Sequence, residues 1–134
     1  MKKTIVLLLS VFVLGSCMKD KENQAPTNEL LIGVWTNAIY KDGYLKLSKA
    51  DELADDSYGF TFFEDGTFLE QKNAGWCGTP PVSYLDYYGN YEVMSDSIIE
   101  IEVGYWGGRT TFDIFIRTLN DSKIEIEYRN ILYL

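Results

Sequence analysis

The chain has 134 residues but no histidine and only two cysteines, and both shortages exclude kinds of chemistry. Without an imidazole there is no Ser-His-Asp or Cys-His arrangement that could activate a nucleophile. There is also no histidine to serve as a metal ligand. We therefore expect no catalytic site of these types, no metal site and no cofactor.

Positive charge is scarce as well. The chain carries 12 Lys and Arg against 20 Asp and Glu, a formal net charge of −8. Proteins that bind nucleic acids need a basic surface, so this balance argues against a nucleic-acid partner. Paired carboxylates at Asp51, Glu52, Asp55 and Asp56 could act as acid and base or bind calcium, but their spacing fits no EF-hand loop. We interpret them as a solvated acidic segment and expect that the protein is not an enzyme.

Long apolar runs are missing except at the start of the chain. Lys2 and Lys3 precede an apolar run over residues 4–14, which is shorter than the ~20 residues that a membrane-spanning helix needs. Such a run is typical of the core of a signal peptide. It ends in Leu14-Gly15-Ser16-Cys17, which resembles the end of bacterial lipoprotein signals, where a lipid is attached to the cysteine before cleavage. The alternative is an ordinary secretory signal that contains a cysteine by chance.

This resemblance divides the chain into three parts. Residues 1–16 would be the signal peptide, residues 17–29 the lipidated cysteine with a polar tether containing Pro26, and residues 30–134 one folded domain. Losing Lys2 and Lys3 takes the formal net charge from −8 to −10, so a lipid, not charge, would hold the protein on a membrane. Cys77 would then lack a disulfide partner and is expected to be a small buried residue.

The tether bears on localisation. Lys19-Asp20-Lys21-Glu22 is similar to the charged tags that follow the lipidated cysteine in surface-displayed lipoproteins of Bacteroidetes. We expect an exported protein in the cell envelope, anchored in the outer membrane. Surface display and attachment facing the periplasm both stay open.

From residue 30 onward the pattern predicts β-strands. Ile99, Ile101 and Val103 alternate with Glu100 and Glu102, as in a strand with one buried face. Asp65-Gly66 is a strong signal for a hairpin turn. Strands are expected over residues 33–40, 44–47, 58–64, 67–73, 86–94, 98–104, 109–119 and 123–132.

Consecutive short strands with tight turns favour an all-β fold, an up-and-down antiparallel β-barrel of seven or eight strands. Ser48-Lys49-Ala50-Asp51 has the form of a capping box and predicts a short helix near residues 49–54. The aromatics at alternating positions are expected to fill the barrel: Phe60, Phe62, Tyr91, Phe112 and Tyr128.

The two ends of such a barrel differ in sequence. The short polar turns at residues 65–66, 95–97 and 120–122 fall at one end, which predicts a closed end. The longer connections gather at the other end and carry aromatic rings, which can stack on sugars, apolar ligands or a protein partner. The candidate ligand-binding residues at this aromatic mouth are Trp76, Tyr84, Tyr87, Tyr88, Tyr105, Trp106 and Arg109. The alternative for each ring is simple packing.

Three short motifs carry a family resemblance. Gly33-Val34-Trp35 at the start of the first strand resembles the Gly-x-Trp signature of lipocalins. The segment 60–68 and the later Gly89-Asn90-Tyr91 are similar to small lipocalin-like lipoproteins of Bacteroidetes. The resemblance implies a lipocalin-like (calycin) barrel in which Trp35 plugs the closed end. It also implies that a basic residue of the last strand, Arg129, lies over that ring. A second lipocalin motif, similar to Thr-Asp-Tyr, is missing.

We therefore expect a membrane-anchored, lipocalin-like lipoprotein that binds a small apolar or glycan-type ligand at an aromatic-rimmed mouth. The alternative is an interaction module of the cell envelope, with a barrel filled by side chains and a protein partner at its loops.

Overall fold

The computed structural model describes residues 29–75 and 82–134. The predicted signal peptide, Cys17, most of the tether, Trp76 and Cys77 lie outside the described residues. Within the part of the chain that is described, no helix has the length and apolar character needed to cross a membrane.

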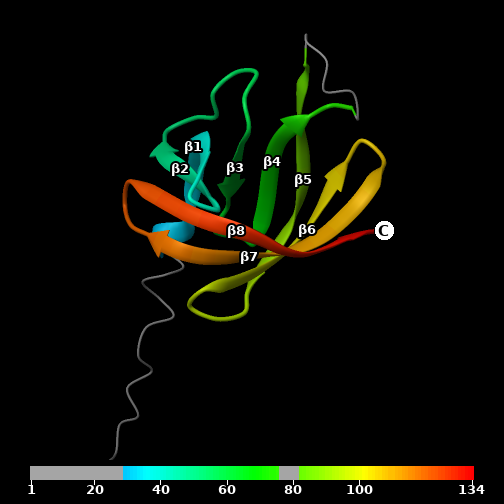
Figure 1. The fold of residues 1–134 in the computed structure, drawn as a ribbon. Helices are drawn as coiled ribbons and strands as arrows, with labels where there is room; N and C mark the ends of the chain where they lie inside the picture. The colour runs from blue at the N-terminus through cyan, green and yellow to red at the C-terminus, as the bar shows by residue number, and fades with distance from the viewer. Residues whose placement is uncertain (1–28, 76–81) are drawn as a thin grey trace, which may run out of the picture.

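Eight antiparallel strands close into a barrel (Figure 1). They are β1 (Gly33–Lys41), β2 (Tyr44–Ala50), β3 (Gly59–Phe62), β4 (Thr67–Asn73), β5 (Tyr84–Val93), β6 (Ile98–Tyr105), β7 (Gly108–Leu119) and β8 (Lys123–Tyr133). The predicted all-β barrel is confirmed, and each expected strand is present with its ends shifted by a few residues at most. The expected helix near residues 49–54 is wrong, because β2 continues to Ala50 and Lys49 points into the barrel.

The strands follow their sequence order around the barrel except at one place. β1 lies between β2 and β3, so the barrel closes through the pairing of β2 with β8. The connection over residues 51–58 crosses the outside of β1, where the Ala54 N–H donates to Thr36 Oγ1 at 3.4 Å. Gln71 of β4 holds the same connection by donating to the carbonyl oxygens of Ala54 and Ser57, at 2.7 and 2.9 Å.

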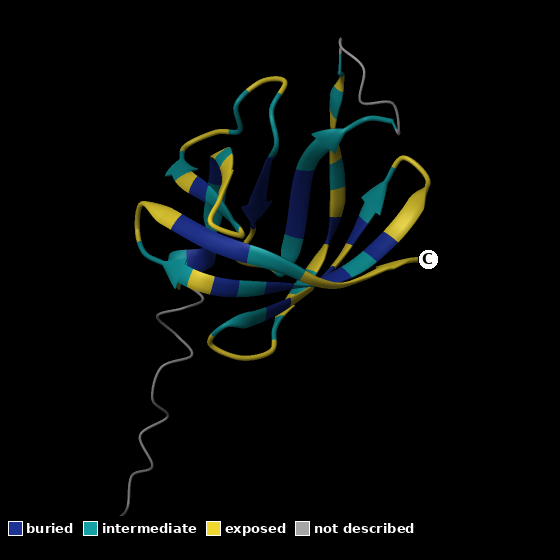
Figure 2. Cartoon of the chain, viewed as in Figure 1, coloured by how far each residue is buried: buried dark blue, intermediate teal, exposed yellow. Residues whose placement is uncertain are grey.

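Buried and exposed side chains alternate along the strands, as Figure 2 shows for β6 and β7. The inward side chains fill the end of the barrel at which β1 begins. Phe60, Phe62 and Phe68 are fully buried there with ring centroids 5.0 to 5.7 Å apart, a usual spacing for packed aromatic pairs. Aliphatic residues of β6, β7 and β8 complete the core: Ile99, Ile101, Val103, Ile114, Ile116, Ile124 and Ile126.

The closed end is built around Trp35, which is completely buried. Its indole N–H donates to the Leu31 carbonyl oxygen at 2.8 Å. The ammonium group over the ring belongs to Lys49 of β2, 4.5 Å from the ring centroid. The expectation that Arg129 has this place is wrong, because β2 separates β8 from β1 and because Arg129 points outward. Its guanidinium lies 4.1 Å from the centroid of the Phe115 ring instead.

Two bulges shape the opposite end. Asn37 in β1 and Asn130 in β8 have φ angles of 55° and 53°, in the left-handed region that asparagine tolerates better than most residues. At each position one strand contains an extra residue relative to its partner. The side chains that follow are thereby turned, so that Tyr40 after the first bulge and Ile131 and Tyr133 after the second line the inside of the open end.

Candidate functional site

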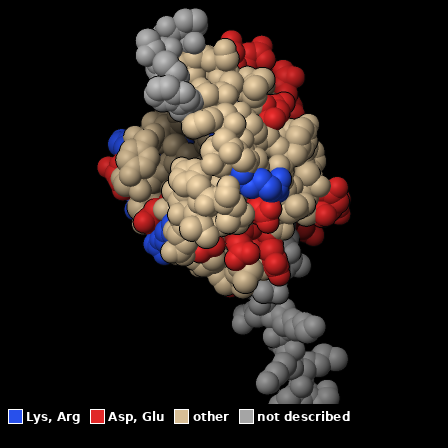
Figure 3. Space-filling view, turned by 90° about the vertical axis from the view of Figure 1, so that its right-hand side faces the viewer, with Lys and Arg blue, Asp and Glu red and all other residues tan. Residues whose placement is uncertain are grey.

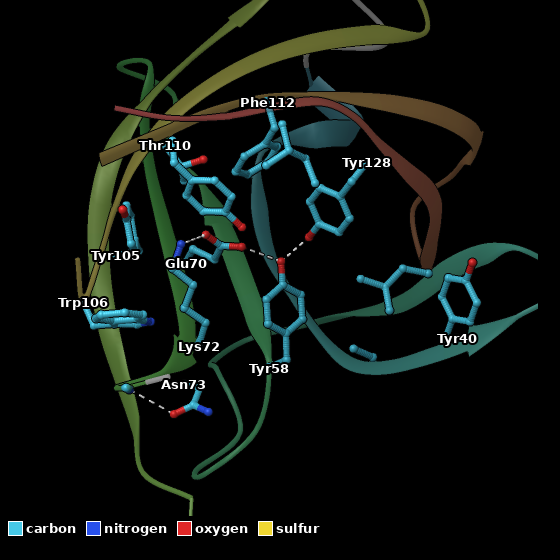
Figure 4. A pocket seen from close by; sticks show the side chains of 15 residues that line it. Tyr40, Tyr58, Glu70, Lys72, Asn73, Tyr105, Trp106, Thr110, Phe112 and Tyr128 are labelled. Atoms are coloured by element: carbon cyan, nitrogen blue, oxygen red, sulfur yellow. Dashed lines mark hydrogen bonds and ion pairs between the residues drawn. The ribbon is translucent and has the colours of Figure 1, made fainter. Parts of the chain in front are cut away.

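The open end of the barrel holds a cavity of about 840 Å³. The residues that line it come from β1, β2, β4, β6, β7 and β8 and from positions next to β3, β4 and β6 (Figure 4). They are Ala38, Tyr40, Leu45, Tyr58, Glu70, Lys72, Asn73, Gly75, Tyr105, Trp106, Thr110, Phe112, Tyr128, Ile131 and Tyr133. The barrel is thus filled with side chains at its closed end and hollow at its mouth.

A chain of polar groups crosses the apolar wall of this cavity (Figure 4). The Tyr58 hydroxyl donates to Glu70 Oε1 at 2.7 Å and is also hydrogen-bonded to the Tyr128 hydroxyl. The Lys72 ammonium lies 2.6 Å from Glu70 Oε2. Glu70 is only 4% exposed, and burying a charge is costly unless it is paired and hydrogen-bonded. The ion pair and the phenol together meet that requirement.

The strand pattern explains why these charges lie inside. Alternate residues of β4 face inward, so Phe68, Glu70 and Lys72 share one face. Phe68 packs in the closed end. Glu70 and Lys72, the next two inward-facing residues of β4, lie nearer the mouth, in the wall of the cavity. Charged side chains are seldom buried unless they are paired, so an acid and a base at two successive inward positions mark this part of the cavity lining as a polar wall.

The surroundings keep both phenols protonated. Burial raises the pKa of Tyr58 well above its ordinary value, and the phenol of Tyr128 and the carboxylate of Glu70 raise it further. Burial and the Glu70 charge also raise the pKa of Tyr128, although its hydrogen bond with Tyr58 acts in the opposite direction. At neutral pH the wall therefore presents two neutral hydroxyl groups beside one ion pair.

Aromatic rings form the rim on the β6–β7 side. The Tyr105 ring lies edge-on to Trp106, with centroids 5.7 Å apart, and edge-on to Tyr133, with centroids 5.3 Å apart. The Trp106 side chain is 54% exposed. Figure 3 shows that mainly uncharged side chains surround the hollow on this face, with a few charged side chains at its edge and most of the acidic ones on other parts of the face.

The structure brings together only some of the residues predicted for the mouth. Tyr105 and Trp106 line the cavity. Tyr87 packs against the core, with the Lys72 ammonium 5.3 Å from its ring centroid. Trp76 lies outside the described residues.

Three other predicted residues are elsewhere. Tyr84 lines a smaller outer hollow of about 440 Å³, together with Asp55 and Asp56. Tyr88 is 61% exposed, next to Tyr87 in β5, and does not line the cavity. Arg109 is exposed and pairs with Glu102 at 2.7 Å, because both side chains point away from the barrel axis. The structure thus does not place these three residues at the cavity, since strand alternation turns Tyr88 and Arg109 outward, and their part in ligand binding stays a prediction.

The sequence interpretation missed the polar wall. Glu70, Lys72 and Tyr58 were not candidates, and Tyr128 was expected only as packing. The alternation in β4 could have identified the two charged residues. Phe68 is expected to face inward, so Glu70 and Lys72, two and four residues later, should face inward too.

Comparison with protein-family models, with curated proteins and with solved structures finds no match to this chain. Among the described residues, no group of acidic or cysteine side chains is arranged to hold a metal ion.

Proposed function

We propose that this protein is an exported, lipid-anchored binding protein of lipocalin-like type, which carries a small and mainly apolar ligand in its open cavity and catalyses no reaction. The observation that carries the proposal is the hollow at the barrel mouth. A barrel that served only as a scaffold could be filled with side chains along its whole length, as it is at the closed end.

The size and chemistry of the cavity support this proposal. Ligand sites in proteins typically have volumes of roughly 300–1,000 Å³, with apolar and aromatic walls and a few polar groups that orient the ligand. The cavity of about 840 Å³ lies in this range, and its two charged groups, Glu70 and Lys72, lie together in one wall. An apolar lining with one polar wall suits an apolar ligand with a single polar group better than a glycan, whose hydroxyl groups would need many partners.

The direction of the chain is compatible with an anchor at Cys17. Gly33 at the start of β1 pairs with Phe62 at the closed end, so the chain enters the barrel there. The Lys49 ammonium donates to the carbonyl oxygens of Leu30 and Ile32 and fixes this entry point. A lipid at the end of the preceding segment would place the closed end toward the membrane and the cavity mouth away from it.

Native mass spectrometry of the protein freshly purified from a bacterial envelope tests ligand binding. We expect a reproducible added mass that disappears on denaturation. A bare protein mass, together with no binding of an apolar fluorescent dye, would contradict the proposal.

Metabolic labelling with a radioactive fatty acid tests the anchor separately. The parent chain should incorporate label, Cys17→Ser should not, and Cys77→Ser serves as the matched control that keeps it. Equal labelling of all three chains, or labelling that depends on Cys77, would contradict lipidation at Cys17.

A second candidate function has support from the rim. Large apolar side chains beside the mouth are exposed: Ile39, Tyr40, Trp106, Ile131, Leu132, Tyr133 and Leu134. Contiguous exposed apolar surface often marks a protein-protein contact. An envelope partner docked on this rim is the alternative, and cross-linking in intact cells should recover a specific partner only if the alternative is correct.

A further inference from the structure

The hydrogen bonds on the polar wall have a fixed direction. A carboxylate that pairs with Lys72 can only accept, so Tyr58 must use its single hydroxyl proton on Glu70. The Tyr128 hydroxyl, which touches Tyr58, must then donate its own proton to the Tyr58 oxygen. The hydroxyl proton of Tyr128 therefore points toward Tyr58, and that of Tyr58 points toward Glu70.

This direction determines what the wall offers to a ligand. Tyr128 is the last member of this series of hydrogen bonds. Its hydroxyl oxygen can still accept a hydrogen bond, but its proton is already donated to Tyr58. Thr110, also in the cavity lining, donates its hydroxyl proton to the Leu132 carbonyl oxygen at 3.0 Å and likewise keeps only acceptor capacity. The hydroxyl oxygens of Tyr128 and Thr110 are thus acceptors that need a donor.

The charges on the wall disfavour an anionic ligand. Lys72 is the only basic residue in the lining that the structure describes, and Glu70 already neutralises it at 2.6 Å. A second carboxylate beside Glu70 would meet a like charge and lose its hydration in an apolar site.

Resting on the proposed function, we propose that the cavity selects an apolar ligand whose polar group is an uncharged hydrogen-bond donor, such as the hydroxyl of a long-chain alcohol, and that Tyr128 accepts its proton. A ligand whose polar group can only accept a hydrogen bond, such as a ketone, leaves the Tyr128 oxygen without a donor. The carboxylate of a fatty acid is repelled by the negative charge of Glu70.

Three probes with the same carbon number test this selectivity: dodecanol, dodecanone and dodecanoate. Each is used to displace a neutral apolar dye, N-phenylnaphthylamine, from the protein at neutral pH. The protein begins at residue 17 and carries Cys17→Ser, so that no signal peptide, lipid or detergent competes for the cavity. One good hydrogen bond changes affinity by roughly fivefold, so dodecanol should bind about fivefold more tightly than dodecanone or dodecanoate.

The Glu70→Gln variant gives the sharpest control, because it reverses the direction of the hydrogen bonds that join residue 70, Tyr58 and Tyr128. The glutamine oxygen would face Lys72, its amide would donate to Tyr58, Tyr58 would donate to Tyr128, and Tyr128 would present a proton to the cavity. Dodecanone should then bind within about twofold of dodecanol. Tyr128→Phe should weaken dodecanol about fivefold and leave dodecanone unchanged. Tyr88→Phe, which removes a hydroxyl outside the cavity, should change neither.

The outcomes separate this inference from the proposed function. If the dye binds but all three probes displace it equally well, or dodecanoate displaces it best, the selectivity is refuted and ligand binding stands. Selectivity that survives both Tyr128→Phe and Glu70→Gln would also refute it. If neither the dye nor any probe binds, the proposed function fails as well. Dye affinity close to that of the parent confirms that each variant is folded.

Discussion

Lys49 lies over Trp35, with its ammonium nitrogen 4.5 Å from the centroid of the indole ring. The same ammonium donates to the carbonyl oxygens of Leu30 and Ile32, while the indole N–H donates to Leu31. Two side chains from neighbouring strands thus hold three consecutive carbonyl groups of the segment that enters the barrel. One residue serves both as the cation over the ring and as the anchor for the entering chain.

Replacing Lys49 with methionine should therefore destabilise the protein. The apolar stem of the side chain is kept, but two carbonyl oxygens lose a charged donor and the ring loses its cation. We expect the free energy of unfolding to fall by about 2 to 4 kcal/mol in urea denaturation. Lys46→Met is the matched control: Lys46 lies three residues earlier in β2 and makes long ion pairs, 3.8 Å to Asp42 and 3.4 Å to Glu125. It should cost less than about 1 kcal/mol. Equal losses of stability in the two variants would show that the contacts of Lys49 with the Trp35 ring and the two carbonyl groups have no special role.

Replacing Trp35 with alanine should cost about 3 to 5 kcal/mol, the usual range for deleting a large buried aromatic side chain. Trp35 is fully buried and its indole N–H is hydrogen-bonded. Thermal and urea denaturation measure the loss. If the variant melts like the parent, the closed end does not depend on this residue, and the likeness to lipocalins loses its main support.

Much of the fold could be predicted because local patterns determine it. Alternation in β6 and β8 and the turn at Asp65-Gly66 place the strands within a few residues of their observed ends. The place of β1 between β2 and β3 could not be predicted in the same way. It depends on the connection over residues 51–58 crossing outside Thr36, and that contact joins residues that are distant in sequence.

The same limit explains the errors at the two ends of the barrel. Lys49 and Arg129 are both basic residues in strands, and only the pairing of β1 with β2 decides which one reaches Trp35. At the mouth, aromatic composition singled out Tyr88, and Arg109 was chosen as a basic residue beside the rings, although strand alternation turns both outward. Strand alternation also places Glu70 inside, so the alternation in β4 carries the information about the polar wall that composition lacks.

Replacing Gly89 with alanine should destabilise the barrel by several kcal/mol. A Cβ atom there would lie 1.9 Å from the Glu102 carbonyl oxygen and 2.6 Å from the Val103 Cα, so β5 and β6 would have to move apart. Overpacking of this kind typically costs about 1 to 3 kcal/mol, and backbone atoms yield less than side chains. The matched control is Gly75→Ala, where a Cβ would meet no atom of the described residues within 4 Å, and it should melt like the parent. A Gly89→Ala variant of unchanged stability would contradict the close approach of the two strands.

Stability should fall at high pH because of Tyr58 and Tyr128. Burial raises the pKa of both phenols in the folded protein above the ordinary value of 10.0, so the unfolded chain loses these protons first. The contribution is complete below pH 10 and is lost as the pH rises beyond it, by about 1.4 kcal/mol per pH unit for each phenol that stays protonated when folded. Tyr91, whose pKa is raised by burial and by the Asp65 charge, adds to the slope.

Urea denaturation at a series of alkaline pH values measures this slope. Tyr128→Phe removes one of the late-titrating phenols and should make the slope shallower. Phenolate absorbance should also show fewer tyrosines that ionise only when the chain unfolds. An unchanged slope would mean that Tyr128 is not protected from ionisation in the folded protein.

Replacing Trp106 should lower ligand affinity without lowering the stability of the fold. Its side chain lines the cavity but is 54% exposed, so little packing is lost when it is removed. We expect Trp106→Ala to leave the melting temperature nearly unchanged and to weaken binding of an apolar dye about tenfold, the effect of losing one aromatic contact surface. Tyr88→Ala and Arg109→Ala remove side chains that were predicted for the mouth but lie outside the cavity, and they should bind the dye like the parent. If those two variants weaken binding as much as Trp106→Ala, the ligand is held by the outer surface of the barrel rather than by the cavity.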